Sequence, residues 1–110
     1  HYNMEYLNEE QQQILSELTN DIAQGRRLTL AERLALPDMA AMIYELRQLQ
    51  LYINKEGTTY SVVGKSGDLY NKHRPEYQQL TDLRKELRQL RKQLLEGVAD
   101  EASEVSEYFN

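Results

Sequence analysis

The chain has 110 residues, about the size of one domain, and 40% of them are hydrophobic, with a mean hydropathy of −0.76. This composition indicates a soluble, polar protein with a thin core, and no apolar run approaches the roughly 18 to 20 residues that cross a bilayer. The absence of cysteine excludes disulfides and thiolate metal sites, and it fits a reducing cytosol. The chain begins with His1 rather than methionine, and we base no expected element on residues 1–3.

The net charge of −5 is unevenly distributed along the chain. Residues 1–64 carry a net charge of −4, residues 65–96 carry +3, and residues 97–110 carry −4. Because the Debye length is about 10 Å at 0.1 M salt, a basic middle region can bind phosphate although both ends are acidic. The overall acidity therefore does not exclude a nucleic-acid partner.

Two capping boxes predict two helices that follow one another closely near the N-terminus. Asn8 with Gln11 three residues later is the pattern of a helix start, and Gly25 is a natural stop for that helix. Thr29 with Glu32 repeats the pattern and opens a second helix only a few residues later. This spacing predicts a helix-turn-helix-like part.

The middle of the chain predicts a long helical region followed by a small β-hairpin. Pro37 is expected either to start a third helix or to kink the second, after which the helical pattern continues to Ile53. Gly57 ends this region, and the β-branched and aromatic residues on both sides of a glycine-rich turn predict a hairpin over residues 57–73.

The last expected helix begins at Pro75 and carries leucines at alternating steps of three and four, the a/d spacing of a coiled-coil seam. The seam consists of Leu80, Leu83, Leu87, Leu90 and Leu94. A lone helix of this length is marginal in water, so its partner is either another element of the chain or a second copy. We favour self-association over packing within a monomer. Gly97 is the expected helix end, and residues 98–110 are expected to form an acidic, flexible tail.

These elements predict a mainly α-helical single domain over residues 1–97. Its expected parts are the helix-turn-helix-like and central helical region over 8–53, the β-hairpin over 57–73, and a C-terminal oligomerisation helix over 75–96.

Catalytic chemistry has little support in the sequence. The histidines are His1 and His73, and the motifs HExxH and GxSxG are absent. The segment Gly64-Lys65-Ser66-Gly67 lacks the upstream glycine of a phosphate-binding loop and precedes a strand, so we interpret it as a turn. We expect no enzymatic activity, no cofactor and no metal.

Basic residues gather at two places that could contact phosphate. Arg26 and Arg27 stand at the junction of the first two helices, and Arg33 lies one turn into the second. The last helix carries Arg84, Lys85, Arg88, Arg91 and Lys92. The alternatives are a solvated loop at the first place and salt bridges with a neighbouring subunit at the second. We also expect Tyr108 and Phe109, at the end of the tail, to contact a protein partner.

Several pieces follow one another in an order that indicates a family. They are Leu28-Thr29-Leu30, Ile43-Tyr44, Tyr52, Gly57-Thr58-Thr59-Tyr60, Lys65-Ser66-Gly67, Arg74-Pro75-Glu76, Leu83-Arg84 and Leu87-Arg88. Their order and spacing over residues 8–95 resembles the small terminase subunit of tailed double-stranded DNA bacteriophages. The resemblance implies a ring-shaped homo-oligomer in the host cell cytoplasm that binds viral DNA and hands it to the large terminase subunit. It also implies that the protein modulates that partner's ATPase and nuclease and has no chemistry of its own.

Two other classes of protein remain open at this point. The heptad alone is compatible with a coiled-coil adaptor that binds no DNA. The helix-turn-helix spacing is compatible with a dimeric transcription regulator that binds one palindromic site.

Overall fold

The computed structural model describes the backbone of residues 5–109 and the side chains of residues 5–94. Over this part of the chain it contains three helices and one two-stranded antiparallel sheet, so the predicted mainly α fold with a small hairpin is confirmed. The elements are α1 (Glu9–Ala23), α2 (Leu30–Glu56), β1 (Thr59–Val63), β2 (Leu69–His73) and α3 (Pro75–Phe109).

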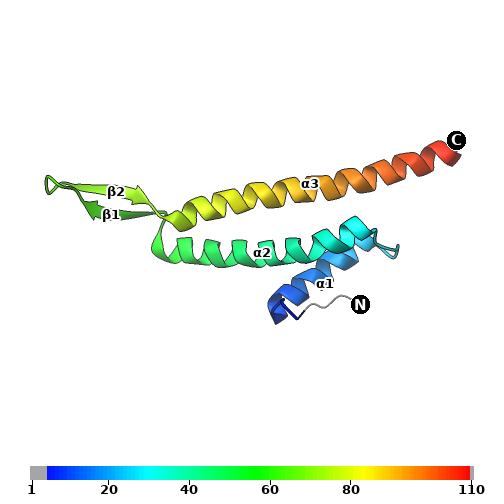
Figure 1. Cartoon of the computed structure of the whole chain (residues 1–110), viewed down its shortest axis with the longest axis horizontal. Coiled ribbons are helices and arrows are strands. Elements are labelled where there is room, and N and C mark those ends of the chain that lie inside the picture. The colour runs from blue at the N-terminus through cyan, green and yellow to red at the C-terminus, as the bar shows by residue number, and fades with distance from the viewer. Residues whose placement is uncertain (1–4, 110) are drawn as a thin grey trace.

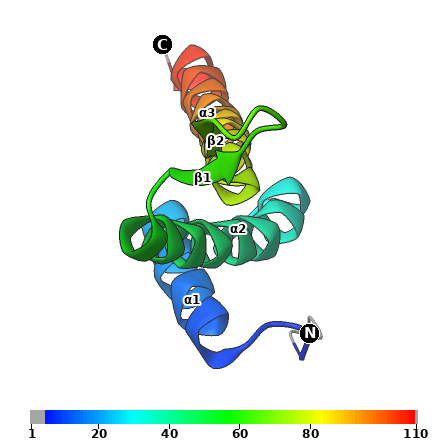
Figure 2. The same ribbon diagram turned by 90° about the vertical axis from the view of Figure 1, so that its left-hand side faces the viewer.

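The molecule is elongated, with extents of 72 × 33 × 18 Å. The helices α2 and α3 run side by side along the long axis in opposite directions, and the hairpin that joins them projects from one end (Figure 1). The helix α1 crosses on the other side of α2 from α3 (Figures 1 and 2). The helix α2 is therefore the central element.

Both predicted capping boxes are present. The Asn8 side chain accepts a hydrogen bond from the Gln11 amide at 2.8 Å, and the Gln11 side chain accepts one from the Asn8 amide at 2.9 Å. At the start of α2 the Thr29 hydroxyl accepts from the Glu32 amide at 3.1 Å, and the Glu32 carboxylate accepts from the Thr29 amide at 2.9 Å. These bonds satisfy amide groups that have no partner within the first turn of each helix.

A third helix starting at Pro37 was one of two expectations for this position, and the structure shows that it is wrong. The helix α2 continues from Leu30 to Glu56 with Pro37 inside it. Proline removes one amide donor from the helix interior, which destabilises a helix. Pro37 is buried together with its neighbours Leu36, Met39 and Ala40, so hydrophobic burial at this position offsets the lost hydrogen bond.

The hydrophobic core lies mainly between α2 and α3. Its buried cluster combines Leu36 and Met39 from α2 with Leu87 and Leu94 from α3. Partly buried residues of all three helices and of the connection between α1 and α2 extend the cluster: Leu15, Leu18, Ile22, Leu28, Ala35, Met42, Ile43, Leu46 and Leu90. The core is thus thin and follows α2 rather than filling a globular interior.

This packing changes the interpretation of the leucine seam. Leu80, Leu87 and Leu94 are buried within the chain, and Leu83 and Leu90 are half-buried. The apolar side of α2 lies next to the seam because the short hairpin connection makes α2 and α3 antiparallel neighbours. The structure therefore places the three buried leucines in the core of one chain, where they are not open to a second copy.

The predicted end of the last helix at Gly97 is also wrong. The helix α3 continues to Phe109. A glycine inside a helix costs only about 1 kcal/mol relative to alanine, and the residues that follow contain alanine and glutamate but no proline. The residues expected to form a flexible tail are therefore mostly part of α3, and the predicted partner contacts of Tyr108 and Phe109 concern side chains that lie outside the described ones.

The hairpin prediction is confirmed in detail. The two strands pair from Thr59 opposite His73 to Val63 opposite Leu69. The turn is closed by the Gly64 amide, which donates to the Asp68 carbonyl at 2.8 Å, and Gly67 adopts a φ of 85° that favours glycine.

The base of the hairpin is attached to the end of α2 through Arg74. The Arg74 amide donates to the Thr58 carbonyl at 2.8 Å, and the guanidinium donates to the Glu56 carbonyl at 3.1 Å. The same guanidinium lies 5.7 Å from the centre of the Tyr60 ring. One side chain therefore connects the last turn of α2, the first strand and the start of α3.

Candidate nucleic-acid interface

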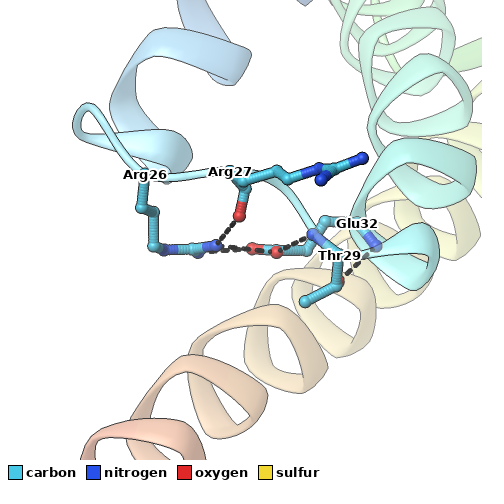
Figure 3. Close-up of polar contacts among 4 residues, drawn as sticks. All are labelled: Arg26, Arg27, Thr29 and Glu32. Carbon is cyan, nitrogen blue, oxygen red and sulfur yellow. Dashed lines mark hydrogen bonds and ion pairs between the residues drawn. The ribbon is translucent and has the colours of Figure 1, made fainter.

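The first predicted phosphate contact, Arg26, is engaged in an ion pair within the chain. Its two terminal nitrogens donate to the two Glu32 carboxylate oxygens at 2.9 and 2.6 Å, and one of them also donates to the Arg27 carbonyl at 3.2 Å (Figure 3). The Glu32 carboxylate is buried, with 5% of the residue exposed. The Arg26 guanidinium therefore has a structural partner within the chain, and its contact with DNA stays a prediction.

The lowered pKa of Glu32 supports its pairing with Arg26. The hydrogen bond from Arg26 lowers the pKa of Glu32 from 4.5 to about 2; burial opposes the change, and hydrogen bonds with Thr29 add to it. The carboxylate is consequently ionised at neutral pH and neutralises the Arg26 cation. The sequence did not indicate this pair, since Glu32 was already assigned to the capping box.

The other two arginines of this cluster differ from each other. Arg27 is exposed, and its side chain extends away from the ion pair of Arg26 and Glu32 (Figure 3). Arg33 is half-buried and already has an interaction partner. Of the three arginines predicted here, only Arg27 presents an exposed guanidinium.

A more concentrated basic site lies between α2 and α3. A groove of about 370 Å³ has Ile43, Leu46 and Leu87 in its lining. Its charged residues are Arg47 from α2 and Arg84, Arg88 and Arg91 from α3, and we call this site the arginine groove. The three arginines of α3 lie on one face because they are four and three residues apart. The antiparallel packing brings Arg47 to the same groove.

The positive charge of the arginine groove is not neutralised by the described part of the chain. No carboxylate is among the residues that line it, and none of its four arginines forms an ion pair with a described residue. Arg84 donates a hydrogen bond to the neutral side chain of Gln50. Planar guanidinium groups can bind phosphate oxygens through two parallel hydrogen bonds. The groove therefore has the chemistry of a phosphate-binding surface.

The basic residues predicted to contact phosphate on the last helix fall into two groups in the structure. Arg84 and Arg88 line the groove together with Arg91, whereas Lys85 and Lys92 are exposed outside it. Lys92 has an interaction partner within the chain. Sequence analysis missed Arg47, because a single arginine on the second helix has no distinctive spacing and only the pairing of α2 with α3 reveals its position.

The part of the chain that the structure describes contains neither a candidate metal site nor a candidate membrane-spanning helix. No three histidine, aspartate or glutamate residues gather there as metal ligands. No described helix combines the length and apolar character needed to cross a bilayer. Comparison of the chain with protein-family models, curated proteins and solved structures finds no match.

Proposed function

We propose that the chain is the small subunit of a tailed-bacteriophage terminase, which binds viral DNA and regulates the large terminase subunit during genome packaging in the host cell cytoplasm. The ordered pieces between Leu28 and Arg88 support the family assignment. The observation that carries the DNA-binding part is the arginine groove, because four cations without an acidic partner among the described residues lie along one side of the α2–α3 pair.

The expected binding is electrostatic and repeated. Each phosphate that a cation neutralises on duplex DNA contributes about 0.9 to the negative slope of log K against log salt concentration. A few contacts per subunit bind weakly, but a multimer presents them several times on one duplex and gains affinity through effective concentration. Such binding tolerates many sequences, since phosphate contacts carry no base information.

The experiment is a titration of labelled duplex DNA, followed by fluorescence anisotropy at several salt concentrations. The groove variant combines Arg47→Gln, Arg88→Gln and Arg91→Gln, and it leaves Arg84 bonded to Gln50. If each removed cation contacts one phosphate, the slope falls by about 2.7 for each engaged subunit.

The control removes charge from exposed lysines outside both the groove and the hairpin, Lys55→Gln and Lys85→Gln, and the change in slope is compared per charge removed. We expect this variant to lose less than one unit of slope. Equal affinities and equal slopes for both variants would reject the arginine groove as the DNA contact.

The same assay separates the proposal from its two rivals. A coiled-coil adaptor predicts no binding at low or moderate salt, and a dimeric regulator predicts tight binding to one palindromic site. The native mass adds an independent criterion, since a multimer well above a dimer supports the terminase proposal over both.

A further inference from the structure

A second hollow lies on the other side of the α2–α3 pair from the arginine groove. It has a volume of about 520 Å³, and its lining includes the carboxylates of Glu45 and Glu76 and the larger side chains of Tyr44, Leu49 and Tyr52. We call it the acidic hollow. At about 100° per residue, Glu45 and Tyr52 lie about 160° and 140° around α2 from Arg47, so the two sites face different directions.

The acidic hollow carries negative charge that the described residues do not neutralise. No lysine or arginine is among its lining residues, and neither Glu45 nor Glu76 forms an ion pair with a described residue. Its tyrosines and leucine also expose apolar surface, with Tyr52 remaining 39% exposed. A suitable occupant therefore combines positive charge with apolar side chains.

The β-hairpin has this combination of properties. Every strand residue is exposed apart from half-buried Val62, and the apolar pair next to the turn, Val63 and Leu69, is 65% and 73% exposed. Lys65 and Lys72 supply exposed positive charge that exceeds the one exposed carboxylate of the hairpin, Asp68, and Lys72 lies over the Tyr70 ring at 5.9 Å. A lone two-stranded hairpin is at best marginally stable in water. The hairpin would therefore gain stability from a partner surface.

We propose that the hairpin of one copy docks into the acidic hollow of a second copy. Lys65 and Lys72 would meet Glu45 and Glu76, and the apolar hairpin tip would cover the exposed rings and Leu49. The hairpin cannot fill the hollow of its own chain, because it projects away from the end of the helix pair (Figure 1). The inference rests on the multimer in the proposed function and adds the surfaces that build it.

This contact has a geometric consequence for assembly. The donor hairpin and the acceptor hollow are different surfaces, so a docked pair leaves one donor and one acceptor free unless the two copies exchange hairpins reciprocally; without that exchange the interface is head-to-tail. Such interfaces close into rings or continue as filaments. The arginine groove on the other flank stays open to DNA.

The test uses two charge-reversed variants of the full chain, measured by native mass spectrometry and light scattering. The hairpin variant carries Lys65→Glu and Lys72→Glu, and the hollow variant carries Glu45→Lys and Glu76→Lys. We expect each variant alone to be monomeric. A 1:1 mixture should form a multimer in which the two variants alternate, since the intact hairpin meets the intact hollow and the reversed hairpin meets the reversed hollow.

Two further variants guard against loss of folding or a general effect of charge. Combining all four reversals restores opposite charges across the interface and should restore the multimer. A control with Lys55→Glu and Lys85→Glu makes the same charge change on exposed helix positions outside both surfaces, and it should keep the mass of the unchanged protein.

The inference is overturned if either reversed variant keeps the mass of the unchanged multimer. It is equally overturned if the mixed variants, folded by circular dichroism, remain monomers. In both cases the anisotropy measurement on the arginine groove is unaffected, so the DNA-binding proposal stands or falls separately. A monomeric unchanged protein rejects this inference together with the ring, whatever its affinity for DNA.

Discussion

Replacing Glu32 by glutamine tests how much the ion pair at the start of α2 stabilises the fold. Glutamine is similar in size to glutamate and can still accept the hydrogen bond from the Thr29 amide, so the substitution retains the capping box. It removes the negative charge that receives two hydrogen bonds from Arg26. The change in stability therefore reports mainly on the charge.

The expected magnitude follows from the pKa of Glu32, which falls from 4.5 to about 2 in the folded protein. This difference corresponds to about 3 kcal/mol of stability at neutral pH. The Arg26 side chain is 33% exposed, so water screens part of the interaction. We expect Glu32→Gln to lower the free energy of unfolding by about 2 kcal/mol at pH 7.

The pH dependence has a definite sign. The pKa of Glu32 is lower in the folded than in the unfolded protein, so the contribution is fully present above about pH 4.5 and is lost as the pH falls towards 2. Urea unfolding followed by circular dichroism, at equal protein concentrations, should show a gap between the two proteins at pH 7 that closes near pH 2. Glu86→Gln, at an exposed position of α3, is the matched control. The reasoning is refuted if the two proteins are equally stable at pH 7, or if the gap is the same at both pH values.

Three further outcomes are expected. Leu80→Ala, at a residue 1% exposed, should lower the free energy of unfolding by about 2 to 5 kcal/mol, whereas Leu51→Ala, at a residue 62% exposed, should change it by less than about 0.5 kcal/mol; urea titration checks both. Gly67→Ala places a side chain at a φ of 85° and should destabilise the hairpin by about 1 kcal/mol, seen as faster amide hydrogen exchange in the strands but not in the helices. Deleting residues 98–110 should abolish co-purification with a large terminase subunit while the multimer persists, and unchanged co-purification would reject that role for the segment.

The parts of the fold that depend on local chemistry could be predicted from the sequence. The capping boxes at Asn8 and Thr29 involve residues three positions apart, and the hairpin follows from its turn residues and β-branched strands. Pro37 was expected to interrupt a helix and Gly97 to end one, but both lie inside helices. The cost of proline in a helix is offset by hydrophobic burial at Pro37, and the cost of glycine is offset by the helix-forming residues around Gly97.

The arginine groove was harder to predict from the sequence, because it depends on which helices pair. A heptad of leucines shows that a partner is needed but not whether the partner belongs to the same chain, and here α2 supplies it for Leu87 and Leu94. Similarly, counting basic residues includes Arg26, whose partner lies six positions away across a turn, and overlooks Arg47. Both the Arg26–Glu32 ion pair and the position of Arg47 depend on neighbours in the fold that linear spacing does not encode.

The attachment of Arg74 to the end of α2 determines how steadily the hairpin is held. A five-residue strand is about 17 Å long, so a tilt of about ten degrees at its base would displace the far turn by about 3 Å. The bonds from Arg74 to the Thr58 and Glu56 carbonyls oppose such a tilt. A hairpin that is held in one orientation loses less orientational freedom on docking, so under the proposed contact Arg74 would favour binding without touching the partner surface.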